Sequence, residues 1–266
     1  MYCGFYGFKR MPFSATSNPD FFFESDSHRE AYAAIEFGIS QRKGIILITG
    51  EVGTGKTTLC KKLLGRLEKN VKVSLVLNPY FSDMQLLQAI VEDFGISTQK
   101  KNRLEIIKAL NMFLIEQHAK DGNAVLIIDE AQHLTARQLE QVRLLSNLET
   151  SDEKLLQLVL VGQPELVENL SQYRLRQIRQ RIFVKHKLLP LQEDEVKKYI
   201  HVRLKDAGRE DLSIDKDCYR MIYEFSGGIP RLVNMLCDRA LLMGYVREKS
   251  RLDETILQDS IKEISL

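Results

Sequence analysis

The sequence predicts an α/β fold in which helices sandwich a parallel sheet, followed by a small all-helical domain. Two observations support this prediction. Short apolar runs alternate with amphipathic helical stretches up to about residue 188, and after Pro190 helical patterns follow one another without further apolar runs. Strands that alternate with helices form βαβ units, and such units build a parallel sheet with helices on both faces.

The candidate strands are five apolar runs. They are Ile45 to Ile48, Val71 to Leu77, Val125 to Ile128, Leu158 to Val161 and Ile182 to Val184. The first and third consist almost entirely of Ile, Leu and Val, a composition typical of strands that are buried on both faces. A helical pattern that starts at Ser27 precedes the first run.

Four helical patterns are expected after Pro190, over residues 192–206, 215–226, 230–246 and 253–264. Glycines and Pro230 separate them, as expected for residues that end and start helices. We therefore expect an α/β domain over residues 28–188 and a small helical domain over residues 189–266.

Residues 1–27 form a lead-in segment rich in aromatic residues and turn formers. These are Phe5, Tyr6, Phe8, Pro12, Phe13, Asn18, Pro19 and Phe21 to Phe23. The segment has neither a helical nor a strand pattern, and it has too many aromatic side chains for a disordered tail. We expect it to pack onto the domain; an exposed aromatic patch that binds a partner is the alternative.

The composition is ordinary for a soluble globular protein, with 44% hydrophobic and 28% charged residues. A net charge of +2 gives no argument for nucleic acid or for an anionic membrane. The four cysteines lie far apart and match no zinc-binding spacing. Because the sequence has neither an apolar stretch of about 20 residues nor a signal-peptide pattern, it indicates a cytoplasmic protein.

The motif GxxxxGK[ST] lies between the first apolar run and a helical pattern. It consists of Gly50, Glu51, Val52, Gly53, Thr54, Gly55, Lys56 and Thr57, and Thr58 follows it. Glycines let the backbone curl so that N–H groups point at phosphate oxygens, and the helix start adds the positive end of its dipole. Lys56 should reach the β- and γ-phosphates, and the Thr57 hydroxyl should bind Mg²⁺. The motif predicts an ATP site; a chance glycine-rich turn is the alternative.

The third apolar run ends in two acidic residues, Asp129 and Glu130. Because the chain turns at the end of a strand, both carboxylates can face one site. We expect Asp129 to hold Mg²⁺ through its water shell and Glu130 to orient and deprotonate the attacking water. The string from Asp129 to Gln132 superficially resembles the acidic motif of helicases, but the chain lacks a recognisable second helicase core and is too short for two such domains.

The order of these motifs resembles the AAA+ ATPases, and more narrowly the family of general secretion pathway protein A, also called ExeA. The segments that carry the resemblance are Met1-Tyr2, Phe5 to Phe8, Pro12-Phe13, Gly50 to Thr58, Asp129 to Gln132, Val161 to Leu166 and Gly228 to Arg231. The resemblance covers essentially the whole chain. It implies a P-loop NTPase of the AAA+ type with a C-terminal helical lid.

The resemblance also implies roles for single residues. Gln163 stands where AAA+ proteins carry a polar sensor of the γ-phosphate, or it is a surface-turn glutamine. Arg231 resembles the second sensor, which contacts the phosphates and reports lid closure, or it is a solvated helix residue. Asn78 stands where relatives restrain the catalytic glutamate, although Asn-Pro also simply makes a turn. His28 lies in a region that borders the adenine, or it packs or caps a helix.

An arginine-rich segment follows the fourth apolar run. Its basic residues are Arg174, Arg176, Arg179, Arg181, Lys185 and Lys187. On the same resemblance, one arginine should be the finger that a neighbouring subunit inserts into the active site to neutralise charge on the transferred phosphoryl group. Arg181 is the first choice and Arg179 the second. A solvated basic face and contact with a nucleic-acid backbone are the alternatives.

The resemblance further implies an ATP-dependent homo-oligomer that couples turnover to conformational change in an envelope or secretion complex, whose protein partner recruits it to the inner membrane. Longer family members add a membrane span and a peptidoglycan-binding domain; neither occurs up to Leu266, so we do not expect a direct cell-wall role. The alternative is a DNA-associated regulator of the transposition type, disfavoured by the small net charge and favoured by the arginine-rich segment. A nucleotide-dependent switch with negligible turnover is a third reading.

Overall fold

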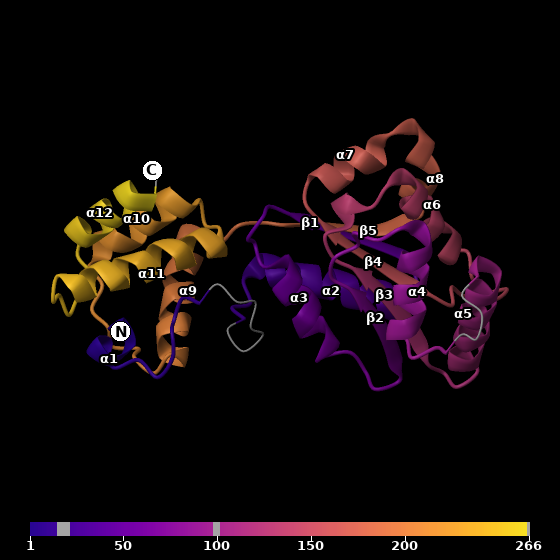
Figure 1. Cartoon of the computed structure of the whole chain (residues 1–266), viewed down its shortest axis with the longest axis horizontal. Helices are drawn as coiled ribbons and strands as arrows, with labels where there is room; N and C mark the ends of the chain where they lie inside the picture. Colours follow the sequence, from indigo (N-terminus) through magenta and orange to yellow (C-terminus); the bar gives the residue numbers. More distant parts are fainter. Residues whose placement is uncertain (15–21, 98–101, 265–266) are drawn as a thin grey trace. The chain divides into compact units, whose positions relative to one another are not determined.

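The computed structural model describes residues 1–14, 22–97 and 102–264, which form two compact units (Figure 1). One unit, here called the helical unit, comprises Met1–Ser25, Glu51–Thr58 and Leu189–Leu266. The other, the sheet unit, comprises Asp26–Gly50 and Leu59–Leu188. Each unit has a hydrophobic core of its own. In the described part of the chain, no helix combines the length and the apolar character that a bilayer span requires.

The described residues of the sheet unit form a five-stranded parallel sheet, which confirms the predicted fold class. Its strands are β1 (Ile45–Gly50), β2 (Val71–Val76), β3 (Asn123–Ile128), β4 (Gln157–Gly162) and β5 (Ile182–Leu188), in the order β2-β3-β4-β1-β5. As their composition predicted, β1 and β3 are buried along their whole length, and so is β4. Because all strands run parallel, the carboxyl ends of β1, β3 and β4 meet at one edge of the sheet.

Helices cover both faces of this sheet. On one face, a single core joins alternate residues of β1, β3 and β4 to the helices α4 (Asp83–Asp93), α5 (Arg103–His118), α6 (Ala136–Leu145), α7 (Glu165–Ser171) and α8 (Arg176–Gln180). The opposite face is covered by α2 (Asp26–Ser40), with α3 (Lys56–Leu64) following the phosphate loop. Gly38 allows α2 to approach closely, because a Cβ there would lie 2.5 Å from Cδ1 of Ile46.

The helical unit contains the helices predicted after Pro190, each within one residue of the expected start. They are α9 (Glu193–Asp206), α10 (Lys216–Ser226), α11 (Pro230–Val246) and α12 (Glu254–Ile264). Gly227 ends α10 with a φ of 55°, and Pro230 occupies the first turn of α11, where its missing N–H costs nothing.

The turn between α10 and α11 is tied to the segment that leads into α9. The Leu191 N–H donates to the carbonyl oxygen of Gly228 at 2.9 Å. Gly228 has a φ of 75°, and a Cβ at this position would lie 1.9 Å from the Leu191 carbonyl oxygen. Only glycine satisfies both the backbone conformation and this close approach.

The lead-in segment differs from the sequence-based expectation in two ways. Residues Tyr2–Tyr6 form a short helix, α1, where no helix was expected, and Gly7 ends it in the left-handed conformation. The aromatic side chains do pack, but into the core of the helical unit, where Tyr2, Tyr6, Phe8 and Phe13 are buried. Burial of Tyr2 and Tyr6, one turn apart, stabilises a helix too short to form by itself. Asn18, Pro19 and Phe21 lie outside the described residues.

Two buried polar groups hold the lead-in segment in place. The Tyr6 hydroxyl donates to the carbonyl oxygen of Lys249 at 3.0 Å. The Arg203 guanidinium, which is 4% exposed, donates to the carbonyl oxygens of Pro12 and Ser14 at 2.6 and 3.1 Å. The first fourteen residues are therefore an integral part of the helical unit.

Candidate nucleotide site

The phosphate loop, residues 51–55, joins β1 to α3 and curls back on itself. Gly53 and Gly55 have φ angles of 84° and 98°, which residues with a Cβ rarely adopt. The Thr54 N–H and hydroxyl donate to the carbonyl oxygen of Glu51 at 3.3 and 2.8 Å. Nζ of Lys56 donates to the same oxygen at 2.9 Å. The positive φ angles of the two glycines thus accompany a loop that curls back until the carbonyl oxygen of Glu51 accepts hydrogen bonds from Thr54 and Lys56.

The residues present fit a magnesium-bound nucleoside triphosphate. Lys56 is only 5% exposed, and a buried ammonium is costly unless acceptors or anions surround it. The first N–H groups of α3, which starts at Lys56, have no partner within the helix and suit an anion. Thr57 and Asp129 supply hydroxyl and carboxylate oxygens, the ligand type that Mg²⁺ prefers.

Arg231 lies in the first turn of α11, and its backbone contacts the phosphate loop. Its N–H donates to the carbonyl oxygen of Gly53 at 3.3 Å. A Cβ on Gly53 would lie 2.6 Å from Cβ of Arg231 and 3.1 Å from Cγ2 of Ile229. The structure therefore places the start of α11 against the loop and gives Gly53 a second reason to be glycine, while the second-sensor role of the Arg231 guanidinium stays a prediction.

Asp129 and Glu130 follow β3 at the carboxyl edge of the sheet. Asp129 is 1% exposed; its N–H donates to the carbonyl oxygen of Val76 at 2.8 Å, and its Oδ1 accepts the N–H of Glu130 at 2.9 Å. Glu130 has a φ of 52°, which is uncommon for a residue with a side chain. The chain thus turns sharply at the end of the strand, where the sequence predicted that it would.

Two glutamine amides hold the carboxylate of Glu130. Its Oε2 accepts hydrogen bonds from Nε2 of Gln132 and, at 3.2 Å, from Nε2 of Gln163. Gln132 lies in the short 3₁₀ helix η2 (Ala131–His133), and Gln163 directly follows β4. Among the described residues, the Asn78 side chain makes no hydrogen bond, so the restraint that the resemblance implied for Asn78 comes from these glutamines instead.

Gln132 is the site residue that the sequence reasoning missed. Gln132 ends the string from Asp129 to Gln132, which contributed to the family resemblance but was given a role only for Asp129 and Glu130. Nothing in that string shows that the Gln132 side chain folds back onto Glu130. That contact depends on the turn at Glu130 and on the neighbouring strand β4.

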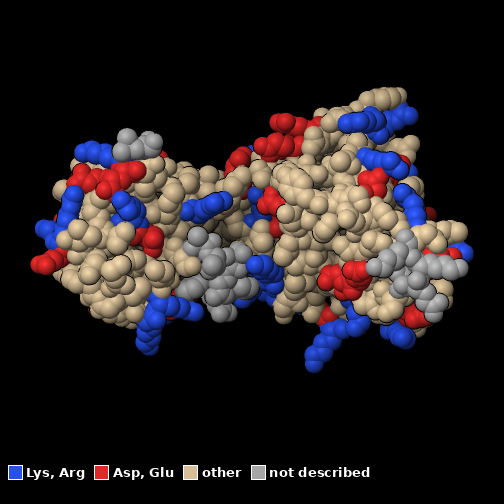
Figure 2. Space-filling model, viewed as in Figure 1, with Lys and Arg blue, Asp and Glu red and all other residues tan. Residues whose placement is uncertain are grey.

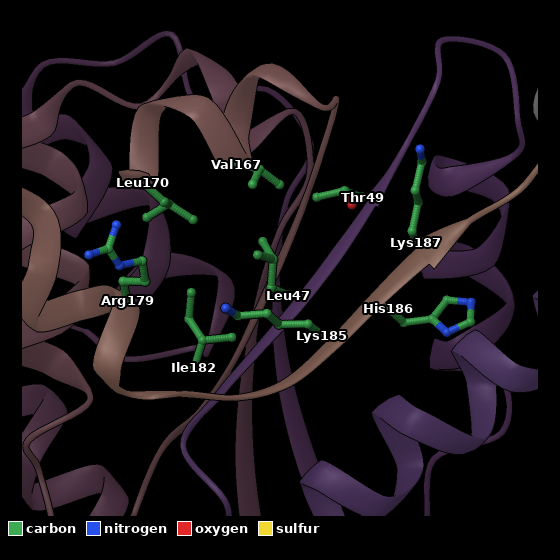
Figure 3. Close-up of a pocket in the computed structure, with 9 residues that line it drawn as sticks. All are labelled: Leu47, Thr49, Val167, Leu170, Arg179, Ile182, Lys185, His186 and Lys187. Atoms are coloured by element: carbon green, nitrogen blue, oxygen red, sulfur yellow. The ribbon is translucent and has the colours of Figure 1, made fainter. Parts of the chain in front are cut away.

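The two arginines considered for the finger differ in their surroundings. Nη1 of Arg179 donates to the carbonyl oxygen of Ser171 at 3.0 Å. Arg179 also lines a pocket together with Lys185 and Lys187, over a floor of apolar side chains from β1, α7 and β5 (Figure 3). Within the described residues, the guanidinium of Arg181 makes no hydrogen bond or ion pair.

Together, the fold and these residues define a P-loop nucleotide-binding protein of the AAA+ class. Residues 39–170 match the family described as AAA domain. The structure is also similar to the crystal structure of Cdc6p from Pyrobaculum aerophilum, with a TM-score of 0.68 and 18% identity, covering 96% of this chain and 68% of that chain. At this identity the similarity concerns the fold alone.

The sequence comparison is more specific. The chain is 41% identical over 248 residues to general secretion pathway protein A of Aeromonas hydrophila, covering 93% of this chain and 45% of that protein. It therefore belongs to the same family of AAA+ proteins, and the resemblance is confirmed. It is also 25% identical over 153 residues to ATP-dependent target DNA activator B of Escherichia phage Mu, covering 58% of this chain and 45% of the activator. The chain spans less than half the length of either relative.

Proposed function

We propose that this chain binds ATP with Mg²⁺ and hydrolyses it. The observation that carries the proposal is the closed phosphate loop, in which a buried Lys56 stands at the start of α3, where the positive end of the helix dipole favours an anion. The carboxylate of Glu130, fixed by two amides, supports turnover in addition to binding. Membership of the AAA+ class supports both.

In this proposal each part of the loop binds one part of the nucleotide. Backbone N–H groups of residues 50–58 hold the phosphate oxygens, and Lys56 neutralises the β- and γ-phosphates. Thr57 and Asp129 hold Mg²⁺, which when bound neutralises charge that develops on the phosphate oxygens.

Three side chains then act at the γ-phosphate of the same subunit, and a fourth acts at the site of a neighbouring subunit. Glu130 orients the attacking water and accepts its proton. Gln163 contacts the γ-phosphate and is already in contact with Glu130, so it links phosphate sensing to the base. Arg231, at the start of α11, reports the state of the lid, and Arg181 serves as the finger for the site of a neighbouring subunit.

We further propose that the protein works as an ATP-dependent homo-oligomer in the cytoplasm. It drives conformational change in a partner protein of a secretion or envelope complex. The partner protein brings it to the inner membrane. The identity of 41% with general secretion pathway protein A supports this assignment. The division into a lead-in segment, an α/β domain and a lid domain belongs to the same proposal.

A DNA-associated regulator is the second candidate. The similarity to ATP-dependent target DNA activator B and the basic pocket around Arg179, Lys185 and Lys187 favour it. The charge distribution does not: on the face drawn in Figure 2, acidic and basic side chains are interspersed instead of forming one basic stripe. The secretion-associated ATPase therefore remains the first candidate.

Phosphate release from ATP tests the proposed activity. We expect wild-type protein to turn over ATP, Lys56→Ala to lose both binding and turnover, and Glu130→Gln to bind ATP but to hydrolyse it very slowly. Lys62→Ala, on the same helix but outside the motif, is the matched control and should keep wild-type activity. Full activity of Lys56→Ala would overturn the nucleotide site, and unchanged turnover in Glu130→Gln would overturn the assignment of the base.

Binding of duplex DNA, measured by anisotropy with a non-hydrolysable ATP analogue, separates the two candidates. A secretion-associated ATPase should bind DNA weakly at any salt concentration. Tight binding that weakens steeply with salt would favour the DNA-associated regulator instead.

A further inference from the structure

The side chain of Gln132 connects two polar groups at the carboxyl edge of the sheet. Its Nε2 donates to Oε2 of Glu130, and its Oε1 accepts the backbone N–H of Gln163 at 3.0 Å. Its own backbone carbonyl accepts Nδ2 of Asn169, on α7, at 3.3 Å. The residue is thus held at its backbone as well as at both ends of its amide.

The orientation of this amide follows from its partners. A backbone N–H can only donate a hydrogen bond, so the atom that faces Gln163 must be the amide oxygen. The amide nitrogen of Gln132 is then the atom that faces the carboxylate of Glu130. An ionised carboxylate only accepts hydrogen bonds, so this pairing is chemically consistent at both ends.

Gly162, the last residue of β4, provides the space for the amide. A Cβ at this position would lie 2.8 Å from Oε1 of Gln132 and 2.9 Å from Cδ2 of Leu166. Its backbone is not in the left-handed region, so glycine is required here for room and not for conformation. The Gln132 amide therefore lies over the end of β4, between the loops that carry Glu130 and Gln163.

Gln132 and Gln163 donate to the same oxygen of Glu130. Two N–H donors on one carboxylate oxygen restrict rotation of the carboxylate about its last bond more than one donor does. Gln163 has a proposed second role at the γ-phosphate, whereas the Gln132 side chain hydrogen-bonds to Glu130 and to the Gln163 backbone. Gln132 is therefore placed to act through Glu130.

We propose that Gln132 is a positioning residue for ATP hydrolysis, whose amide orients the carboxylate of Glu130 toward the attacking water. The inference rests on the proposed ATPase activity, in which Glu130 takes a proton from water as the oxygen of that water attacks the γ-phosphate. Misdirection of a catalytic group by about 1 Å can cost roughly 100-fold in rate. Loss of the Gln132 donor should accordingly lower kcat and leave nucleotide binding unchanged.

The substitution Gln132→Glu removes this donor and places a second carboxylate beside Glu130. Glutamate keeps the length of the side chain and an oxygen that can accept the N–H of Gln163, but when ionised it cannot donate to Glu130. We expect kcat to fall about 10- to 100-fold, with KM and the calorimetric affinity for ADP close to wild type. Gln258→Glu, an exposed position on α12, introduces the same charge elsewhere and should be silent.

A second variant and a double mutant distinguish positioning from a structural role. Gly162→Ala, which places a methyl group against Oε1 of Gln132, should also lower kcat. In single-turnover measurements, adding Gln132→Glu to Glu130→Gln should cause no further loss, because Gln132 acts through the carboxylate that is already gone. A purely structural role would lower the rate by the same factor in both backgrounds.

The outcomes separate this inference from the proposed function. If wild-type protein binds ATP but releases no phosphate, the proposed hydrolysis fails and the role of Gln132 falls with it. If wild-type protein turns over ATP and Gln132→Glu keeps the wild-type kcat, the positioning role alone is overturned and the ATPase activity stands. The same holds if Gln132→Glu and Glu130→Gln have additive effects on the activation free energy.

Discussion

Replacing Gly228 with alanine should destabilise the helical unit far more than the same change at its neighbour Gly227. Both glycines have a positive φ, 75° and 55°, so the backbone strain of about 1–2 kcal/mol is common to the two variants. At Gly227 a Cβ meets no atom within 4 Å, whereas at Gly228 it would lie 1.9 Å from the carbonyl oxygen of Leu191. Gly227→Ala is therefore a matched control.

The difference in stability between Gly228→Ala and Gly227→Ala can be estimated from the displacement of Leu191. Leu191 has to shift away, which breaks its 2.9 Å hydrogen bond to Gly228, a loss of about 0.5–1.5 kcal/mol. Forcing a methyl group into a packed site adds about 1–3 kcal/mol. We expect Gly228→Ala to be less stable than Gly227→Ala by about 2–4 kcal/mol, which lowers the urea midpoint by about 1–2 M if the m-value is about 2 kcal/mol/M.

Urea unfolding followed by circular dichroism measures this difference, provided that the m-values of the two variants agree. Because Gly228 lies three residues before Arg231, the displaced turn should also move the start of α11 away from Gly53 and weaken ADP binding. Equal midpoints for the two variants would refute the reasoning, since they would mean that the close approach of Leu191 contributes nothing to stability.

Three further predictions concern the finger arginine, the lead-in segment and the thiols. Mixing inactive Lys56→Ala and Arg181→Ala proteins should restore part of the ATPase activity, because each mixed interface can combine an intact loop with an intact finger; no recovery with intact assembly would count against Arg181. Arg203→Ala should destabilise the protein by about 1–3 kcal/mol, because it leaves buried carbonyl oxygens without donors, and should expose residues 1–14 to trypsin; an unchanged digestion pattern would contradict the packing of this segment. Native protein should react quickly with a thiol reagent at Cys3 alone, since the other three cysteines are buried. Burial also raises the pKa of the Cys218 thiol to about 11, which disfavours the reactive thiolate. Rapid reaction of all four cysteines would refute this prediction.

Local sequence patterns were sufficient for most of the elements. Runs of Ile, Leu and Val predicted β1 and β3 because a strand buried on both faces tolerates little else. Glycine and proline located the ends of α10 and the start of α11 because each restricts or frees the backbone in a known way. Helix α1 was not predicted because its five residues have no helical pattern of their own. It depends on burial of Tyr2 and Tyr6 in the core of the helical unit, which is formed mostly by residues far along the chain.

The candidate site divides in the same way. The spacing of residues 50–57 and the acids at the end of β3 are local motifs, so the chemistry of phosphate and metal binding could be predicted from them. The residues that hydrogen-bond to the Glu130 carboxylate could not be predicted in this way. Asn78 follows β2 as relatives led us to expect, yet its side chain makes no hydrogen bond to another described residue, and Gln132 and Gln163 hold the carboxylate.

The sequence by itself determined that β1 and β3 are buried, where the phosphate loop lies and which acids end β3, because each depends on residues close together in the chain. The tertiary structure decided that the lead-in segment belongs to the helical unit, that Arg231 lies against Gly53, and that the amide of Gln132 passes over Gly162 to Glu130. Those contacts join segments far apart in sequence or depend on the space left by the missing Cβ of Gly162. A local sequence pattern does not contain such distances.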